Sequence, residues 1–201
     1  MSRFIATAAA IAQRGWTVLT DFLRLEVIAE LRDEARQFWQ EEEFRAAGIG
    51  RSGGYAVRSG IRSDHIRWLD DQAPTPAQKL YWEAIEELRQ TLNRELFLGL
   101  ACFEAHFAIY PPGAFYQKHL DRFSDADERV ISCTLYLNEA WQTEDGGQLR
   151  LYFPDGHQDV LPTAGTCALF RSDTFFHEVW PATKARFSLT GWLRRRSLRL
   201  V

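Results

Sequence analysis

The apolar residues in the first half of the chain recur at helical spacing. Between residues 25 and 39 they form the series Leu25, Ile28, Leu31, Ala35, Phe38 and Trp39. Residues three and four apart share one face of an α-helix, so this series predicts a helix with one buried face. A second helix is predicted over residues 76–96 by Leu80, Ile85, Leu88, Leu92 and Leu96. We expect both helices to pack on the outside of a sheet.

Polar residues mark where these helices begin. Thr20-Asp21 is placed to cap the first long helix. Thr75-Pro76-Ala77-Gln78 has the form of a capping box with proline at the first helical position. An apolar stretch over residues 4–12 predicts a shorter helix, and residues 16–19 predict a short strand.

From residue 103 onward the pattern changes to strands separated by turns rich in glycine, proline and aspartate. The predicted strands are 103–110, 115–121, 130–138, 148–153, 157–161, 166–170, 174–179 and 185–193. Eight strands without helices between them predict a mainly β fold, a double-stranded β-helix (jelly roll) core flanked by N-terminal α-helices. We expect a single domain over residues 1–201, with residues 1–100 as mostly helical support plus a substrate loop and residues 101–194 as the jelly-roll core.

Two segments between the predicted elements have open interpretations. Residues 48–60 contain five glycines, which indicates a loop. It is either a plain connection or a lid over a substrate, and the sequence favours neither. Residues 61–69 alternate loosely and predict a strand at a sheet edge.

Composition and charge narrow the possible partners. The 201 residues carry a net charge of −3 with a pI near 6.0, so no broad basic field favours nucleic acid. No run approaches the roughly 18 apolar residues that a membrane span needs. Cys102, Cys133 and Cys167 stand singly in apolar runs, which predicts buried free thiols in a reducing compartment and hence a cytoplasmic protein.

The candidate chemistry begins at His119 and Asp121. In a strand these two side chains point to the same face, because side chains alternate. With His177 from a distant strand they would form a 2-His-1-carboxylate set, which holds non-haem Fe(II) and leaves coordination positions open. Zinc is the rival metal, but closed zinc sites usually need four ligands, often thiolates, and no cysteine is near these residues in the sequence.

A second candidate site lies nine residues after His177. Arg186, Ser188 and Thr190 share one strand face, while Phe187 and Leu189 share the other. An arginine beside hydroxyl groups suits a carboxylate, since its planar fork can donate two hydrogen bonds. The far carboxylate of 2-oxoglutarate would need such a partner. The remaining histidines, His106 and His157, lack a carboxylate at useful spacing, and we expect each to be satisfied or exposed.

Several motifs together resemble one known family. They are Ile61-Arg62-Ser63-Asp64-His65-Ile66-Arg67-Trp68, Tyr110-Pro111-Pro112-Gly113, Tyr116-Gln117-Lys118-His119-Leu120-Asp121, Tyr136-Leu137-Asn138, Gly146-Gly147-Gln148-Leu149-Arg150, His177-Glu178-Val179 and Arg186-Phe187-Ser188-Leu189-Thr190-Gly191-Trp192. Residues 103–194 resemble the catalytic core of the Fe(II)/2-oxoglutarate oxygenases. Within these, the chain is similar to the prolyl hydroxylase branch, which includes the hypoxia-inducible-factor prolyl hydroxylases and their bacterial relatives.

The resemblance implies a protein prolyl 4-hydroxylase that uses Fe(II), 2-oxoglutarate and O2, with ascorbate as reductant and a link to oxygen sensing. The reaction couples oxidative decarboxylation of 2-oxoglutarate, to succinate and CO2, with hydroxylation of a prolyl residue. It implies that His119, Asp121 and His177 bind the metal. The residues implied to contact 2-oxoglutarate are Arg186, Tyr136, Thr190 and Tyr110. Those implied to contact substrate are Arg62, Asp64, Trp68, Arg129 and Trp192.

The partner implied is a protein with a prolyl residue in a flexible loop, and the bacterial relatives point to elongation factor Tu. We expect a monomer that binds neither nucleic acid nor membrane. One alternative is a 2-oxoglutarate oxygenase acting on a free amino acid, another small molecule or an alkylated base. Base dealkylases usually carry a second arginine six residues after the first, where this chain has Trp192. Halogenases replace the carboxylate ligand, but Asp121 is present. The remaining alternative is a non-catalytic jelly-roll module with a structural metal.

Overall fold

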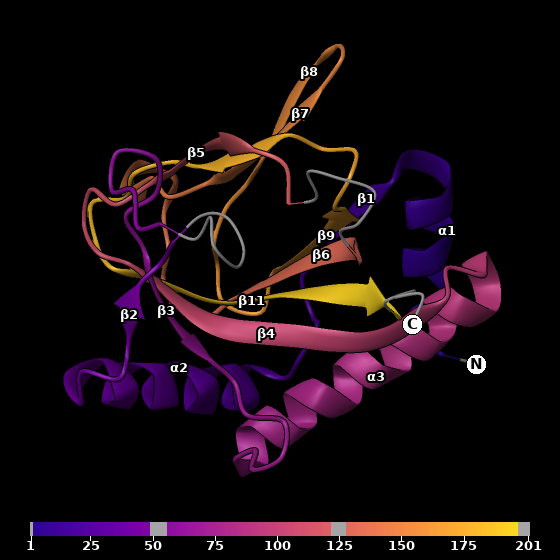
Figure 1. Ribbon diagram of the computed structural model, residues 1–201, viewed down its shortest axis with the longest axis horizontal. Coiled ribbons are helices and arrows are strands. Elements are labelled where there is room, and N and C mark those ends of the chain that lie inside the picture. The colour runs from indigo at the N-terminus through magenta and orange to yellow at the C-terminus, as the bar shows by residue number, and fades with distance from the viewer. Residues whose placement is uncertain (1, 49–55, 122–127, 197–201) are drawn as a thin grey trace.

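The computed structural model describes residues 2–48, 56–121 and 128–196, which form two antiparallel sheets and three α-helices (Figure 1). The helices are α1 (Ile5–Arg14), α2 (Leu25–Gln40) and α3 (Pro76–Leu96). The strands are β1 (Trp16–Leu19), β2 (Arg45–Ala46), β3 (His65–Trp68), β4 (Leu100–Tyr110), β5 (Tyr116–His119), β6 (Arg129–Tyr136), β7 (Leu149–Phe153), β8 (Gly156–Val160), β9 (Cys167–Arg171), β10 (His177–Val179) and β11 (Arg186–Arg195).

The two sheets differ in size and origin. The large sheet has the order β1-β9-β6-β11-β4-β3-β2, and the small sheet has the order β5-β10-β7-β8. The eight strands from β4 to β11 match the eight predicted after residue 100, and their division into two sheets confirms the jelly roll. The predicted edge strand over residues 61–69 forms only at His65–Trp68, where it pairs with β4.

The helices cover the outer face of the large sheet, as predicted. In Figure 1, α2 and α3 run along one side of β4 and β11. Leu31 of α2 and Leu88 of α3 lie in one buried cluster with Phe107, Leu135 and Leu189 of the sheet. Burial of this apolar area is the main force that holds the helices against the sheet.

The helix starts were predicted with mixed success. The Thr75 side chain accepts a hydrogen bond from the Gln78 backbone, but the Gln78 side chain binds Glu34, so only half of the capping box forms. The prediction that Thr20-Asp21 caps α2 is wrong. This helix begins after Arg24, because the connection from β1 first buries the ring of Phe22 completely.

Strand alternation separates the two cores of the molecule. Along β11, Phe187 and Leu189 face the helices, whereas the side chains of Arg186 and Ser188 face the space between the sheets. A second apolar cluster fills part of that space, and it includes Tyr136 of β6. The interior between the sheets is therefore where the polar candidates gather.

Other predictions met different outcomes. Cys133 and Cys167 are buried free thiols, but Cys102 is exposed because it lies near the N-terminal end of β4.

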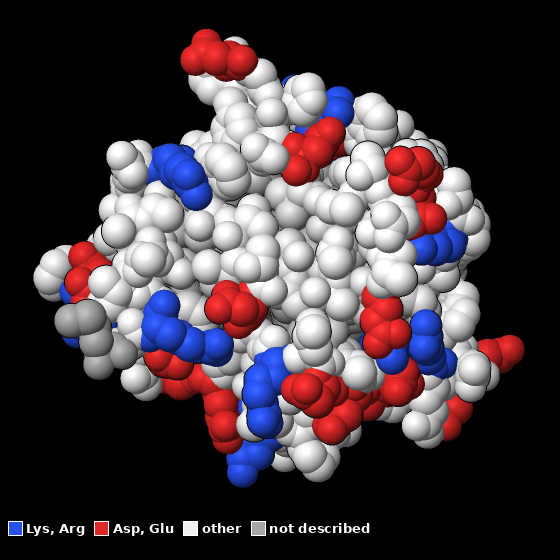
Figure 2. Space-filling model, turned by 180° about the vertical axis from the view of Figure 1, so that it is seen from behind, with Lys and Arg blue, Asp and Glu red and all other residues white. Residues whose placement is uncertain are grey.

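Most of the glycine-rich loop, residues 49–55, lies outside the described residues, as does the polar loop over residues 122–127. Within the described part of the chain, no helix has the length and apolar character required to cross a membrane. Figure 2 shows acidic and basic side chains interspersed on one face, with no extended basic surface there.

Candidate metal and cosubstrate site

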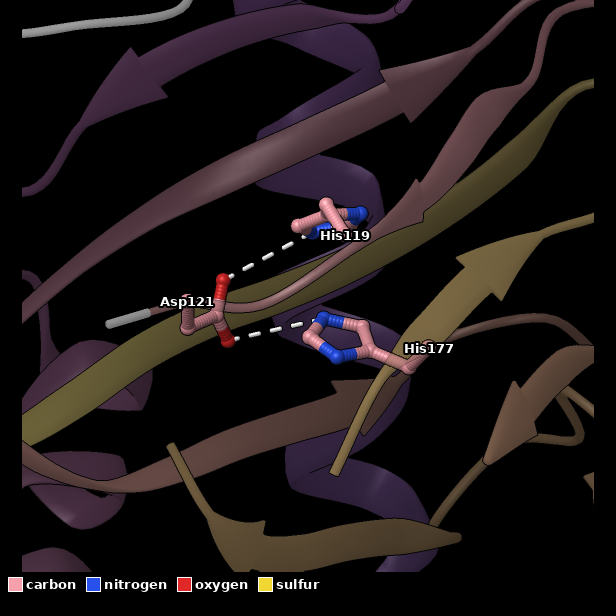
Figure 3. A group of neighbouring side chains, drawn as sticks. All are labelled: His119, Asp121 and His177. Carbon is pink, nitrogen blue, oxygen red and sulfur yellow. Dashed lines mark ion pairs between the residues drawn. The ribbon is translucent and has the colours of Figure 1, made fainter. Parts of the chain in front are cut away.

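Two histidines and one aspartate meet at one end of the small sheet (Figure 3). His119 ends β5, His177 begins β10, and these two residues are direct partners across the strands. Asp121 follows two residues after His119 and places one carboxylate oxygen 3.7 Å from His119 Nε2 and the other 3.5 Å from His177 Nε2. One ligand atom from each residue lies within 4.8 Å of the others, which is close enough to share one ion.

Backbone contacts set the orientation of both imidazoles. His119 Nδ1 lies 2.7 Å from the carbonyl oxygen of Gln117, and His177 Nδ1 lies 3.0 Å from that of Phe175. A carbonyl only accepts, so each Nδ1 carries a proton, and in the neutral form of such a ring the lone pair lies on Nε2. These are the Nε2 atoms that face Asp121, so both rings present a lone pair to the centre of the cluster.

The charge states also suit a divalent cation. Burial opposes ionisation of Asp121, but His177, His119 and a hydrogen bond from Ser132 together hold the pKa of this carboxyl well below its usual range. Burial, and then the neighbouring His119, lower the pKa of His177 to about 4. Near neutral pH the cluster therefore offers an anionic carboxylate and an unprotonated His177, the forms that bind metal.

A chain of buried hydroxyl groups holds the carboxylate in place. Ser132 Oγ donates to Asp121 Oδ2 at 2.6 Å and lies 2.9 Å from Ser172 Oγ. Ser132 and Ser172 are almost completely buried. Since Oδ2 already accepts this bond, the carboxylate has a fixed rotation relative to the two imidazoles.

Replacing Ser132 with alanine is therefore expected to weaken metal binding. Loss of an outer-shell partner typically costs about 10- to 100-fold in metal affinity. The measurement is an anaerobic titration of Mn(II) into metal-free protein. Ser172→Ala serves as the comparison, because Ser172 reaches Asp121 only through Ser132 and should have a smaller effect. Equal affinities for Ser132→Ala and the parent protein would show that the hydroxyl does not orient the ligand.

The second candidate site surrounds Arg186. Its side chain is 1% exposed, and its Cζ lies 4.9 Å from the ring centroids of both Tyr110 and Tyr136. A side chain at Gly147 would place Cβ 3.2 Å from Arg186 Cδ, so glycine at this turn leaves room for the arginine. The positive φ of +72° at Gly147 also favours glycine.

Several buried polar atoms in this site have no hydrogen-bond partner within residues 2–48, 56–121 and 128–196. They are Arg186 Nε, Tyr136 Oη and Ser188 Oγ. In the described part of the chain, no acidic side chain lies within ion-pair distance of Arg186. Burial raises the pKa of Tyr136 to about 12, although Arg186 acts against this shift, so the phenol remains a donor. A buried cation beside two unpaired hydroxyl groups fits a bound carboxylate, as the distal group of 2-oxoglutarate requires.

Thr190 lies on the same strand face as Arg186 but four residues further along, roughly 13 Å at strand spacing. It is the register partner of Thr134 on β6 and of His106 on β4. Thr190 therefore lines the interior between the arginine and the next site residue on β11, Trp192.

The predicted substrate-contact residues fall into two groups. Arg62 donates to both carboxylate oxygens of Asp64, at 2.8 and 2.6 Å, and its guanidinium lies 4.3 Å from the ring centroid of Tyr116. Tyr116 in turn stacks on His119 with centroids 3.5 Å apart. Arg62 and Tyr116 thus form a stacked column that ends on a metal-ligand candidate, and Asp64 anchors the column at the other end.

The other group gathers near the end of β11. Arg129 pairs with Glu104 and places its guanidinium 3.5 Å from the ring centroid of Trp192. Trp68 lies 6.4 Å from Trp192 and is 38% exposed. Asp64 therefore pairs with Arg62, whereas Arg129 pairs with Glu104.

Some residues of the site were not predicted from the sequence. Tyr116 belongs to a recognised motif, but its stacking on His119 depends on local backbone shape. Ser132 gave no signal, because its contact with Asp121 joins different strands. The expectation for His106 is wrong: it is 3% exposed, and its Nδ1 has no partner. His157 is exposed, as expected, but the expectation that it lacks a carboxylate at useful spacing is wrong, because Asp159 Oδ2 lies 4.0 Å from its Nε2.

A jelly roll that brings two imidazoles and one carboxylate together, beside a buried arginine, defines the class of 2-oxoglutarate-dependent non-haem iron oxygenases. Residues 105–194 match the family model described as the 2OG-Fe(II) oxygenase superfamily.

The chain is also similar to individual prolyl hydroxylases. It is 45% identical to a Pseudomonas putida prolyl-4-hydroxylase of known structure, with a TM-score of 0.88 over 96% of this chain and 99% of that one. A Trichoplax adhaerens prolyl hydroxylase, solved with a hypoxia-inducible-factor peptide fragment, is 26% identical with a TM-score of 0.84 over 93% and 86%. Human Egl nine homolog 1 is 28% identical over 90% of this chain and 44% of its own length. The chain spans about half the length of this relative and of its mouse and rat counterparts.

The chain belongs to the 2OG-Fe(II) oxygenase superfamily, in the branch of the prolyl hydroxylases. Fe(II), 2-oxoglutarate and O2 are the cofactor and cosubstrates of this family, and the His119, Asp121 and His177 cluster has the donor set for the metal.

Proposed function

We propose that this protein is an Fe(II)- and 2-oxoglutarate-dependent protein prolyl 4-hydroxylase. The observation that carries the proposal is that one aromatic cluster between the sheets contacts both the metal-ligand cluster, through Tyr116 and Phe170, and Arg186, through Tyr110 and Tyr136. Arg186 is a buried guanidinium with no acidic partner in the described part of the chain. The similarity to prolyl hydroxylases over nearly the whole chain supports the choice of reaction.

The residues of the site divide the binding between the two sheets. His119, Asp121 and His177 would hold Fe(II), and a set of three protein ligands leaves coordination positions open. Arg186 and Tyr136 bind the distal carboxylate of 2-oxoglutarate, and Tyr110 and Thr190 line the same interior between the two sheets. Iron with its cosubstrates supplies the oxidising chemistry, with succinate and CO2 as products and ascorbate as reductant. Because Arg186 and Tyr136 are buried, the groups that they bind would be shielded from water and held in one orientation.

The substrate is proposed to be a protein with a prolyl residue in a flexible loop, and elongation factor Tu is the first candidate. The side chains proposed to contact this residue are those of Trp68, Arg129 and Trp192, since aromatic faces pack well on a pyrrolidine ring. We further propose a monomer in the cytoplasm, as the sequence predicts, and its free thiols accord with a reducing compartment.

The test is mass spectrometry of candidate substrates after incubation with Fe(II) and 2-oxoglutarate. We expect one added oxygen atom on a prolyl residue of elongation factor Tu or of a peptide from its flexible loops. The product must depend on 2-oxoglutarate and disappear in an anaerobic control. Succinate formation with a free amino acid but with no prolyl protein or peptide would support the small-molecule alternative. Metal binding without any 2-oxoglutarate turnover would favour a non-catalytic module.

The Arg62–Asp64 pair provides a prediction about substrate binding. The Asp64 side chain is fully buried, so replacing it with asparagine removes the charge that holds Arg62 in place. Because Arg62 stacks on Tyr116 at the edge of the site, we expect the KM for a prolyl peptide to rise several-fold. Steady-state kinetics with varied peptide measures this change.

The matched control is Glu43→Gln, which breaks the more exposed Arg67–Glu43 pair beside β3. This variant should keep the parent KM, because exposed pairs contribute little. An unchanged peptide KM in Asp64→Asn, with the protein still folded, would remove the pair from substrate binding.

A further inference from the structure

The interior face of β4 carries a histidine that the roles above leave unused. His106 pairs in register with Trp68 on β3 and with Thr190 on β11. By strand alternation it points to the same side as Tyr110, into the space between the sheets. It therefore lies in the row between the 2-oxoglutarate pocket and Trp192.

Three rings form a continuous wall at this position. His106 lies 4.9 Å from Trp68 and 5.5 Å from Trp192 between ring centroids, and the two tryptophans are 6.4 Å apart. Trp68 is partly exposed, whereas His106 and Trp192 are buried. The wall thus has one ring at the surface and two rings in the interior.

Two nitrogen atoms of this wall have no hydrogen-bond partner among the residues that the structure describes. They are His106 Nδ1 and Trp192 Nε1, and both are buried. Buried polar atoms in native proteins are nearly always hydrogen-bonded, so unpaired ones in a binding site mark where a ligand contributes the partner. The indole nitrogen can only donate, so its partner must be an acceptor.

The charge state of His106 indicates the chemistry of that partner. Burial, and then the positive charges of Arg62 and Arg129, lower the pKa of His106 to about 3, so the ring is neutral at ordinary pH. A neutral imidazole and an indole are suitable hydrogen-bond donors for uncharged carbonyl groups. A carboxylate would bind more favourably to the guanidinium of Arg186. A prolyl residue has no backbone N–H, so its peptide neighbourhood is rich in acceptors that need donors.

We propose that His106, together with Trp192, hydrogen-bonds the peptide backbone at the target prolyl residue and so determines substrate specificity. This inference rests on the proposed prolyl hydroxylase function. The three rings would receive the pyrrolidine ring, while the two unpaired nitrogens fix the peptide groups beside it. His106 thereby joins the substrate side of the site and not the 2-oxoglutarate side.

The test compares His106→Phe with His106→Asn. Phenylalanine keeps an aromatic ring but removes both nitrogens, so the KM for a prolyl peptide should rise roughly tenfold, as the loss of one good hydrogen bond implies. Asparagine places an amide near the Nδ1 position and should recover most of the affinity. The KM for 2-oxoglutarate should change by less than twofold in both variants. The control His157→Phe alters an exposed histidine on β8 and should match the parent protein.

The outcomes separate this inference from the proposed function. If the parent protein hydroxylates prolyl peptides and His106→Phe binds them equally well, the inference is wrong and the function stands. A rise in the KM for 2-oxoglutarate instead would assign His106 to the cosubstrate and also overturn it. If the parent protein shows no prolyl hydroxylation, the proposed function fails, and equal binding of a prolyl peptide to the Mn(II)-loaded parent and variant would overturn the inference separately. Thermal melts confirm that each variant is folded.

Discussion

Asp121→Ala is expected to abolish 2-oxoglutarate turnover while the fold remains intact. The carboxylate is the single anionic group of the proposed metal-binding set and faces both Nε2 atoms of His119 and His177. Outer-shell changes already cost about 10- to 100-fold, so the loss of a direct ligand should lower turnover by on the order of a thousand-fold or more. Succinate release, measured with saturating Fe(II) and 2-oxoglutarate, gives the effect directly.

Three comparisons make this result interpretable. Asp121→Asn retains an oxygen that can accept from Ser132 but removes the charge, so it should lose most of the metal affinity as well. Asp155→Ala changes an exposed aspartate in the β7–β8 turn and should behave as the parent. The Tm of metal-free Asp121→Ala should shift by no more than about 2–4 °C. Hydroxylation that persists in folded Asp121→Ala would show that other residues hold the iron.

The sequence predicts the jelly roll well because alternation is a local property. Along β11, the alternation of Arg186, Ser188 and Thr190 with Phe187 and Leu189 predicts correctly which side chains face the helices. The same rule places His119 and Asp121 on one side of the chain before any contact is known.

The failures concern competition between local and long-range effects. Thr20-Asp21 is a good cap in isolation, but burial of Phe22 delays α2 by several residues. Likewise, an apolar neighbourhood in the sequence does not guarantee burial, because Cys102 lies where β4 begins to leave the core. Such results depend on the whole fold, which local patterns do not specify.

Contacts that join distant strands were the least predictable part of the site. The hydrogen bond from Ser132 to Asp121 and the position of His106 between two tryptophans follow from the register of the sheets. One slip in register would turn these side chains to the opposite face, and the sequence alone does not fix pairing across strands.

The two sheets contribute different halves of the site. The small sheet supplies His119 and His177, with Asp121 just beyond it, whereas the large sheet supplies Arg186 and Tyr136. The metal-binding and cosubstrate-binding groups therefore come from opposite walls of one interior. A substitution in the small sheet can be tested by metal binding, and one in the large sheet by 2-oxoglutarate binding. The two roles are therefore experimentally separable.

Arg186→Lys is the sharpest test of the proposed 2-oxoglutarate site on the large sheet. Lysine keeps the positive charge but loses the planar fork that can donate two parallel hydrogen bonds to a carboxylate. A hydrogen bond to a charged group contributes about 1.5–3 kcal/mol. The loss of one such bond should weaken 2-oxoglutarate binding by roughly 10- to 100-fold. Isothermal titration calorimetry on the Mn(II)-loaded protein without oxygen measures the affinity without turnover.

Arg150→Lys is the matched control for this change. Arg150 also donates a fork, to Asp159, but it does so on the more exposed β7–β8 hairpin, away from the interior. The control loses the same kind of paired hydrogen bonds to a carboxylate, and it should bind 2-oxoglutarate with the affinity of the parent protein. Because Arg186 is buried with Nε unpaired, its lysine variant should also lose the rise in Tm that 2-oxoglutarate gives the parent protein. Unchanged affinity and an unchanged ligand-induced rise in Tm would together show that the distal carboxylate binds elsewhere.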